Sequence, residues 1–336
     1  MPAVATIEDV ASRAGVSVAT VSRALRGLPH VSPATRDKVR KIAAELDYRA
    51  NPHASRLAAG RSGTIGIVLP VLNSWFYGNV LAGVEAVVAE DHLDMHLLTV
   101  GGRRAMERFV SDLPALSKQV DGLLIVDLFM PDQLWDDLSG GSLPVASIGL
   151  DTDRFDCVSI DNTAAARDAV MHLLELGHRR IGFIGGGLGE SGELESAELR
   201  RRGMLEAIAS QGIVPDPDLE KSGDFSVAGG RRAMTAMLTH SAPTAVFCTS
   251  DEMAIGAIWA VREAGLSVPD DVAIVGFDDQ PVAQALGLTT VHQPVGSMAA
   301  RAAAMLLERL QGDTATPRRS RVATRLEIRQ STAGST

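Results

Sequence analysis

The chain has 336 residues, 46% of them hydrophobic, which is enough apolar material for two or three folded units and argues against disorder. It contains no run of about 18 uninterrupted apolar residues, so no membrane span is expected. The two cysteines exclude a disulfide framework. The net charge of −9 is uneven: residues 1–60 hold nine basic and five acidic side chains, a net +4, and the remainder holds −13. A basic head on an acidic body is expected when only the head meets phosphates.

Residues 6–26 predict two short helices joined by a tight turn at residues 14–16. Thr6 and Ser17 are suited to cap the two helices, and Gly15 suits the turn between them. Apolar residues fall at helical spacing at Ile7, Val10, Ala11, Ala14, Val21 and Leu25. Val18, Ala19, Ser22 and Arg23 then point outward, as a helix in a DNA major groove would present them. The alternative is an amphipathic helical hairpin packed against the rest of the protein.

A third helix is predicted to follow, with Ser32 as its cap and Pro33 in its first position. Tyr48 ends this small unit. Residues 51–58 are predicted to form a further short helical segment, and a glycine-containing linker is expected to follow it. We therefore expect a DNA-binding headpiece at 1–49, a hinge helix and linker at 50–62, and a body at 63–336.

From residue 64 onward, short apolar runs alternate with helical stretches, which indicates βαβ units and parallel sheets covered on both faces. About 270 residues of this pattern favour two similar α/β lobes with a cleft between them. The predicted strands are Ile65–Leu69, Met95–Val100, Gly122–Val126, Val145–Leu150, Arg180–Gly185, Ala245–Thr249 and Val272–Phe277.

Several ordered motifs run along nearly the whole chain. The first runs from residue 6 to residue 23, and the second covers residues 31–36. The third combines Asn51-Pro52 with Leu57-Ala58. The others are residues 120–124, 160–162, 177–186, 200–203, 275–279 and 288–294. Together they resemble the lactose-repressor/galactose-repressor (LacI/GalR) family of bacterial transcription regulators. The resemblance implies an all-α helix-turn-helix headpiece, a hinge helix, and an α/β body like the type I periplasmic sugar-binding proteins. The expected lobes are an N-lobe at about 63–162 and 292–321 and a C-lobe at about 163–291 and 322–330.

The resemblance also implies which headpiece residues meet DNA. Val18 and Ala19 occupy base-reading positions, where small apolar side chains can pack on a thymine methyl, and Arg23 can pair with guanine. The remaining candidates, most of which match backbone-contacting positions, are Thr6, Ser17, Thr20, Ser22, His30, Ser32, Thr35 and Tyr48. Simple helix capping is the alternative for the hydroxyl side chains, and it is compatible with phosphate contact. Family members bind pseudo-palindromic operators as homodimers.

The hinge segment is too short to hold a helix alone in water, because nucleation is costly. We therefore expect residues 51–58 to become helical only on an operator. The resemblance implies that the leucine at position 57 wedges into the central base step from the minor groove. The DNA-binding candidates in this segment are Asn51, Ala54, Leu57 and Ala58. An ordinary linker with an incidental leucine is the alternative.

The effector candidates come from segments that follow predicted strands or match family motifs: Asn73, Trp75, Phe76, Arg200, Phe225, Ser250 and Asp278. Arg200 and Asp278 can bracket vicinal hydroxyls with charge-assisted hydrogen bonds, which suits a sugar. Each residue also has a plainer interpretation as core or surface. Gly149 and Met204 depart from the family pattern, and these departures leave a nucleobase or nucleoside open as the effector.

An enzyme is disfavoured, because the glycine-rich run at 185–189 lacks the final glycine of a dinucleotide fingerprint and has Glu190 instead. No cofactor or metal is expected. A soluble sugar- or nucleoside-binding receptor is the strongest alternative, and the headpiece opposes it. We expect a cytoplasmic transcriptional repressor that is controlled by an effector and has no membrane partner. Apolar positions at Val80, Ala82, Val84 and Val87 predict that the helix Phe76–Glu90 contributes to the dimer face.

Overall fold

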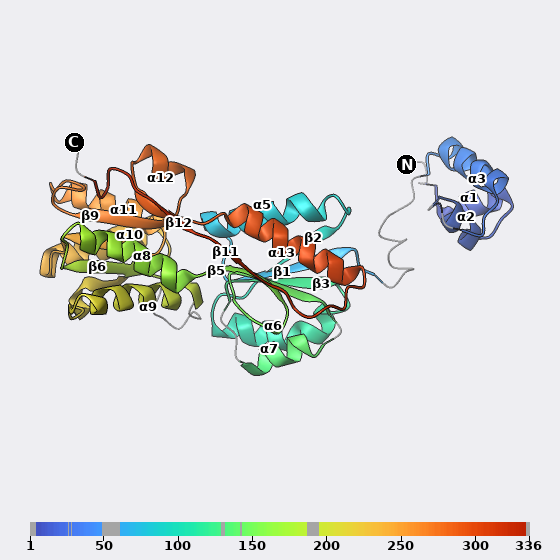
Figure 1. The fold of residues 1–336 in the computed structure, drawn as a ribbon. Coiled ribbons are helices and arrows are strands. Elements are labelled where there is room, and N and C mark those ends of the chain that lie inside the picture. Colours follow the sequence, from blue (N-terminus) through green and yellow to red (C-terminus); the bar gives the residue numbers. More distant parts are fainter. Residues whose placement is uncertain are drawn as a thin grey trace. The chain divides into compact units, whose positions relative to one another are not determined.

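The computed structural model divides the chain into two units, Met1–Gly63 and Thr64–Thr336. It describes residues 5–25, 27, 29–48, 61–128, 132–141, 143–186 and 195–333. The first unit is helical, and the second contains two sheets with helices on their faces (Figure 1). Within these described ranges, no helix is long and apolar enough to cross a membrane.

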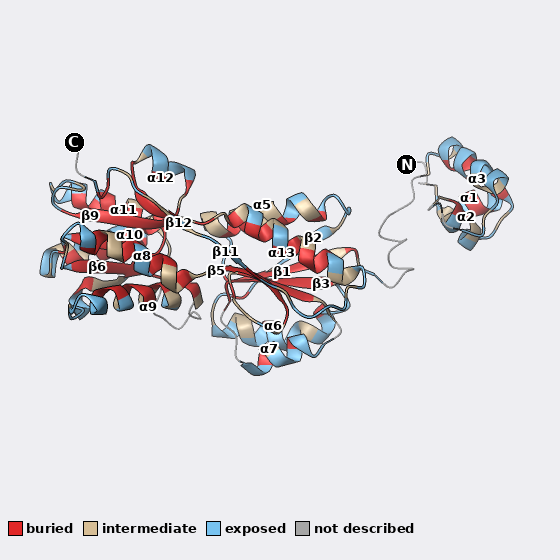
Figure 2. Cartoon of the chain, in the orientation of Figure 1, coloured by how far each residue is buried: buried red, intermediate tan, exposed pale blue. Residues whose placement is uncertain are grey.

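The first unit, called the headpiece below, consists of α1 (Ile7–Ala14), α2 (Val18–Leu25) and α3 (Pro33–Glu45). Its core is built from small aliphatic side chains on all three helices: Val10, Ala11, Ala14, Val21, Ala24, Val39, Ile42 and Ala43. Figure 2 shows these buried positions on the inner sides of the helices, with exposed residues around them. Burial at helical spacing on each helix fixes their mutual packing.

Local caps set the ends of the headpiece helices. Thr6, Ser17 and Ser32 each accept a hydrogen bond from the backbone N–H three residues further on, at 3.3, 3.1 and 3.2 Å. The residue after α1, Gly15, has φ of 68°, a left-handed conformation that glycine adopts at little cost. The predicted caps and turn are confirmed.

The second unit, called the body, begins with a six-stranded sheet in the order β11-β5-β4-β3-β1-β2, with all neighbours parallel. Its strands are β1 (Thr64–Leu69), β2 (Asp94–Thr99), β3 (Gly122–Val126), β4 (Val145–Ile148), β5 (Asp156–Ile160) and β11 (Arg319–Val322). The helices α5 (Trp75–Val88) and α13 (Val295–Leu310) cover one face, and α6 (Arg103–Leu116) and α7 (Asp132–Ser139) cover the other (Figure 1). We call this sheet and its helices the N-lobe.

The C-lobe has a second six-stranded sheet in the order β12-β10-β9-β8-β6-β7, parallel except for β12. Its strands are β6 (Ile181–Gly185), β7 (Glu220–Ser222), β8 (Ala245–Cys248), β9 (Ala273–Asp278), β10 (Thr289–His292) and β12 (Arg325–Glu327). The helices α8 (Asn162–Glu175) and α9 (Glu195–Ser210) pack on one face, and α10 (Val227–His240) and α11 (Asp251–Glu263) on the other. The short α12 (Pro281–Ala285) precedes β10. The predicted doubly wound two-lobe body is confirmed.

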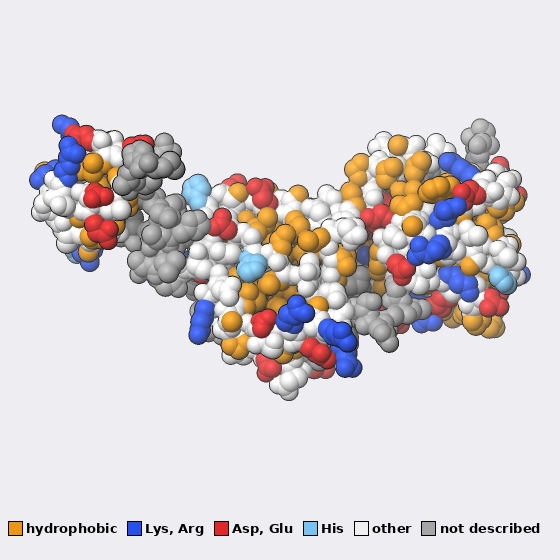
Figure 3. Space-filling model, turned by 180° about the vertical axis from the view of Figure 1, so that it is seen from behind, with side chains coloured by type: hydrophobic (Ala, Val, Ile, Leu, Met, Phe, Trp, Pro, Cys, Tyr) orange, Lys and Arg blue, Asp and Glu red, His pale blue; other side chains and the backbone are white. Residues whose placement is uncertain are grey.

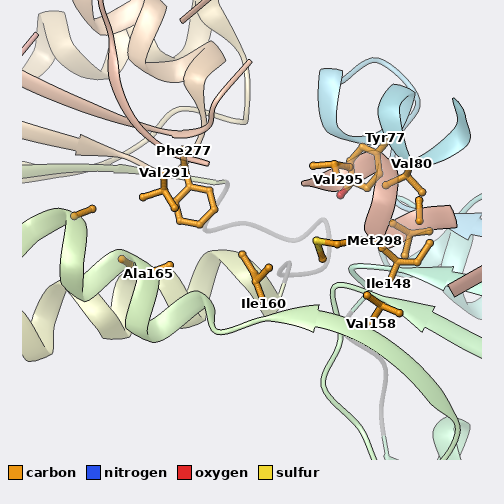
Figure 4. Close-up of a cluster of buried hydrophobic side chains, with 14 of the residues drawn as sticks. Tyr77, Val80, Ile148, Val158, Ile160, Ala165, Phe277, Val291, Val295 and Met298 are labelled. Carbon is orange, nitrogen blue, oxygen red and sulfur yellow. The ribbon is translucent and has the colours of Figure 1, made fainter. Parts of the chain in front are cut away.

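The chain passes between the lobes three times, from β5 into α8, from β10 into α13, and from β11 into β12. One hydrophobic cluster contains side chains of both lobes, and Figure 4 shows part of it around Ile160, Phe277, Val291 and Met298. The segments that follow β1, β2 and β3 in one sheet, and the ends of β7, β8 and β9 in the other, supply residues of the pocket discussed below, together with α5, α9 and α11.

The prediction that α5 contributes to a dimer face loses the support of two of its four apolar positions, Val80 and Val84. Both side chains are fully buried in the N-lobe, where α5 packs closely against α13. The close packing depends on Gly83, because a Cβ there would overlap the carbonyl oxygen of Gly296. The apolar spacing on α5 therefore reflects its own core. Of the four residues in that prediction, Ala82 is exposed and Val87 is half-buried.

Candidate functional site

The headpiece presents the outer face of α2. Val21 and Ala24 anchor the helix in the core, which leaves Val18 41% exposed and also turns Ala19 and Arg23 outward. Arg23 has no ion-pair partner within the described residues, whereas Arg13 on α1 pairs with a carboxylate of α3 at 3.6 Å. A rigid helix with two small apolar side chains and a free guanidinium on one face can enter a DNA major groove and contact base edges.

The other headpiece candidates surround this face. Thr6, Ser17, His30 and Ser32 are exposed, and Thr20, Ser22, Thr35 and Tyr48 are half-buried. The Thr20 and Thr35 hydroxyls lie 2.9 and 2.8 Å from the hydroxyls of the two capping serines, so capping uses the same side chains as the predicted phosphate contacts. In the view of Figure 3, basic side chains lie along one margin of the headpiece, with acidic ones between them. The hinge candidates Asn51, Ala54, Leu57 and Ala58 lie outside the described residues.

In the body, a pocket of about 310 Å³ lies at the carboxyl ends of the strands, lined by residues of both lobes. Its lining residues are Pro70, Val71, Ser74, Phe76, Tyr77, Gly101, Asp127, Ser196, Ala197, Arg200, Asp224, Phe225, Ser250, Glu252 and Asp278. This is the size range of a small-molecule site, and it combines aromatic rings with a few charged groups.

Arg200 of α9 is the buried cation of the pocket, with 5% of its surface exposed. Its Nε donates to Asn162 Oδ1 at 2.9 Å and its Nη1 donates to the Thr249 carbonyl at 2.7 Å. The guanidinium also lies 3.6 Å from the centre of the Phe277 ring, a cation–π contact. These contacts fix the guanidinium in one orientation. Burial lowers its pKa, and the charge of Asp278 opposes that shift.

Asp278 ends β9 and is almost fully buried. Its φ of 116° lies in a region that side chains rarely adopt, so the backbone is strained where the carboxylate enters the pocket. Gln293 Nε2 donates to its Oδ1 at 2.5 Å. Burial raises the pKa of Asp278 to about 7, and the charge of Arg200 opposes this rise.

Two carboxylates join the lobes beside the pocket, and each accepts hydrogen bonds at a helix N-terminus of the opposite lobe. Asp127, which follows β3, accepts from the Ser196 hydroxyl at 2.7 Å in the first turn of α9. Glu252 on α11 accepts from the backbone N–H of Trp75, the first residue of α5, at 3.0 Å. Negative charge at a helix N-terminus is favourable because the backbone N–H groups there are otherwise unpaired. Burial raises the pKa of Asp127, and the bond from Ser196 opposes this rise.

The structure brings together five of the seven predicted effector residues in this pocket: Phe76, Arg200, Phe225, Ser250 and Asp278. The other two are not among its lining residues. Asn73 is exposed, and the side chain of Trp75 packs against the hydrophobic cluster of the lobes. Ser250 lines the pocket and also caps α11 by accepting from the Met253 N–H.

Sequence reasoning missed Asp127, Ser196, Tyr77 and Glu252. A signal existed for Asp127, because it directly follows a fully buried strand, as Asp278 ends one. The others lie in the first turns of helices and have no local pattern that separates them from ordinary helix residues.

Comparisons with known proteins agree with this arrangement. Residues 6–51 match the model of bacterial regulatory proteins of the lacI family, and residues 170–332 match a periplasmic binding protein-like domain. The HTH-type transcriptional repressor CytR of Escherichia coli K12 is 36% identical over 92% of this chain and 90% of its own. A structure of the lac repressor dimer bound to operator and the anti-inducer ONPF has a TM-score of 0.84 at 29% identity, covering 98% of this chain and 99% of that one. The structure of a CelR–cellobiose complex has a TM-score of 0.69 at 33% identity, covering 97% and 99%.

Proposed function

Because this chain belongs to the lacI family of bacterial regulatory proteins, it is a DNA-binding transcriptional regulator, and we propose that it is a homodimeric repressor controlled by a small molecule. The observation that carries the proposal is the exposed face of α2, with Val18, Ala19 and Arg23 held on a capped helix. One such helix contacts only a few base pairs. A dimer that places two of them on a pseudo-palindromic operator supplies the affinity and the specificity that one lacks.

Residues 51–58 belong to this proposal as a hinge helix that reaches the minor groove. A wedge at position 57 unstacks one base step, and the bent complex offsets that cost. Replacing Leu57→Ala is then expected to weaken binding to a specific operator about tenfold or more and to change binding to random DNA by less than about twofold. Gel-shift titrations on both DNAs measure the two values, and an equal loss on both contradicts a wedge.

The effector proposed for the pocket is a sugar. Arg200 and Asp278 supply a donor and an acceptor on the C-lobe side, and the Phe76 and Phe225 rings supply apolar surface for a flat sugar face. The CelR–cellobiose complex supports a sugar in this kind of body. The same rings and polar groups also suit a nucleoside, whose base stacks while its ribose hydroxyls bond.

Selection of DNA sequences from a random library by the full-length protein tests the function. We expect enrichment of one motif with twofold symmetry, and reduced or increased retention of that motif when the effector is present. A library that shows no enrichment, or that yields a single asymmetric half-site, contradicts a dimer on a pseudo-palindromic operator. A body-only fragment is the matched control, because it retains the pocket and lacks α2.

A further inference from the structure

The charges around the pocket are unbalanced. Four carboxylates line it, those of Asp127, Asp224, Glu252 and Asp278, and Arg200 is the one cation among its described lining residues. Asp224 pairs with Arg232 at 3.2 Å, so with all groups ionised the other three carboxylates exceed Arg200 by two negative charges.

The cation is held in place by protein partners through two of its three guanidinium nitrogens, and the third can donate to a ligand. Two nitrogens of Arg200 donate to Asn162 and Thr249, and the guanidinium plane rests on Phe277. A guanidinium that binds a phosphate or carboxylate ligand strongly does so with two parallel N–H bonds from a free edge. Arg200 is therefore a fixed part of the pocket wall rather than a free clamp for an anion.

The helix N-termini at the pocket already bind carboxylates of the protein itself. A free N-terminus of this kind is a ready anion site. Here Asp127 of the N-lobe occupies the first turn of α9, and Glu252 of the C-lobe occupies that of α5. These two carboxylates therefore occupy the positions where an anionic ligand would bind most favourably, and their negative charges repel such a ligand.

From these contacts we infer that the pocket takes an uncharged or cationic ligand rich in O–H or N–H donors and rejects anionic relatives of that ligand. The inference rests on the proposed role of the pocket as the effector site, and it narrows the effector class. Neutral sugars, amino sugars and unphosphorylated nucleosides are uncharged or cationic and rich in such donors. Sugar phosphates, uronic acids and nucleotides carry negative charge and are expected to be rejected.

Matched ligand series test the inference with the full-length protein. Each series contains a parent, such as D-glucose, D-ribose or cytidine, with its phosphate, its carboxylate where one exists, and its amino counterpart. Thermal shift identifies the parents that bind, and isothermal titration gives the dissociation constants. For every parent that binds, we expect the phosphate or carboxylate to bind at least about 100-fold more weakly, because like charges in a buried site are strongly unfavourable.

A variant with two neutralised carboxylates shows whether anions bind weakly because of their charge or because of their larger size. In the double variant Asp127→Asn with Glu252→Gln, each amide oxygen can still accept from its helix, so the shape of the pocket is kept while two negative charges are lost. We expect the ratio between anion and parent dissociation constants to shrink at least about tenfold. Asp270→Asn, an exposed change before the amino end of β9, is the control and leaves the ratio unchanged.

The outcomes are distinct. An anion that binds as tightly as its uncharged parent, or a ratio that the double variant leaves unchanged, overturns the inference while the proposed function stands. Failure of every sugar and nucleoside parent to bind instead overturns the proposed effector class, whatever the anions do.

Discussion

In the headpiece, the hydroxyl caps of the helices bond to residues three positions away. In the pocket, Arg200 is held by residues 38 and 49 positions away, Ser196 reaches Asp127 across 69, and Trp75 reaches Glu252 across 177. The headpiece is thus stabilised by local contacts that leave its reading face free. The pocket places its charged groups through contacts between distant segments of two lobes. Substitutions in the headpiece should affect only the headpiece and its DNA binding. Substitutions in the pocket should affect both effector binding and the stability of the body.

The largest effect is expected for Arg200→Ala. It leaves Asn162 Oδ1 and the Thr249 carbonyl without their donor and removes the positive charge that favours the ionised form of the buried Asp278. We expect a loss of about 3 kcal/mol in the free energy of unfolding of the body, measured in urea, and loss of the effector response. Arg202→Ala on the same helix is the matched control: that side chain is 59% exposed, and its loss should change stability by less than about 1 kcal/mol. Similar losses in the two variants contradict the role assigned to Arg200.

Arg23→Ala tests the other side of the comparison. A bidentate pair with guanine discriminates against the wrong base by about 1–3 kcal/mol, so affinity for the selected operator should fall by roughly 10- to 100-fold. Effector affinity should not change, because the described lining residues of the pocket all belong to the body. Titration of labelled operator DNA measures the loss, with Arg13→Ala as the control because that arginine pairs with Glu45. A loss in Arg13→Ala as large as that in Arg23→Ala contradicts base reading by α2.

The contrast between local contacts in the headpiece and long-range contacts in the pocket explains what could be predicted from the sequence. The helix caps, the exposed face of α2 and seven strands follow from patterns within a few residues. Five strands were missed, and their patterns are weaker: β7 and β12 have three residues each, β10 has four, β11 alternates two arginines with other residues, and β5 mixes an aspartate and a serine with its apolar residues. Asp127 could have been found from its place after β3. Ser196 and Glu252 could not, because their roles depend on where the other lobe lies.

A smaller effect is expected from pH. Burial raises the pKa of Asp278 to about 7, so its contribution to stability is largest below its ordinary pKa and is lost as pH rises through 7. A ligand that donates to the carboxylate favours the ionised form and lowers this pKa. Effector affinity should therefore rise about tenfold from pH 6 to pH 8, with release of a proton. Titration calorimetry in two buffers of different ionisation enthalpy measures both, and Asp278→Asn should abolish the dependence. A flat profile in the unmodified protein contradicts this coupling.

The smallest effect is expected at the first cap of the headpiece. The Thr6 side chain accepts from the Asp9 N–H, while the Asp9 carboxylate accepts from the Thr6 N–H at 2.8 Å, so the two residues satisfy each other's backbone donors. Thr6→Ala removes one of these bonds and should cost about 1 kcal/mol of headpiece stability. Thr6→Ser keeps the hydroxyl and should stay near the unmodified value, and Ser12→Ala, at an exposed position within α1, is the control for hydroxyl loss. Hydrogen exchange of the α1 amides measures the change. If exchange also accelerates in α9 or α11 of the body, the headpiece is not the locally stabilised unit that its contacts indicate.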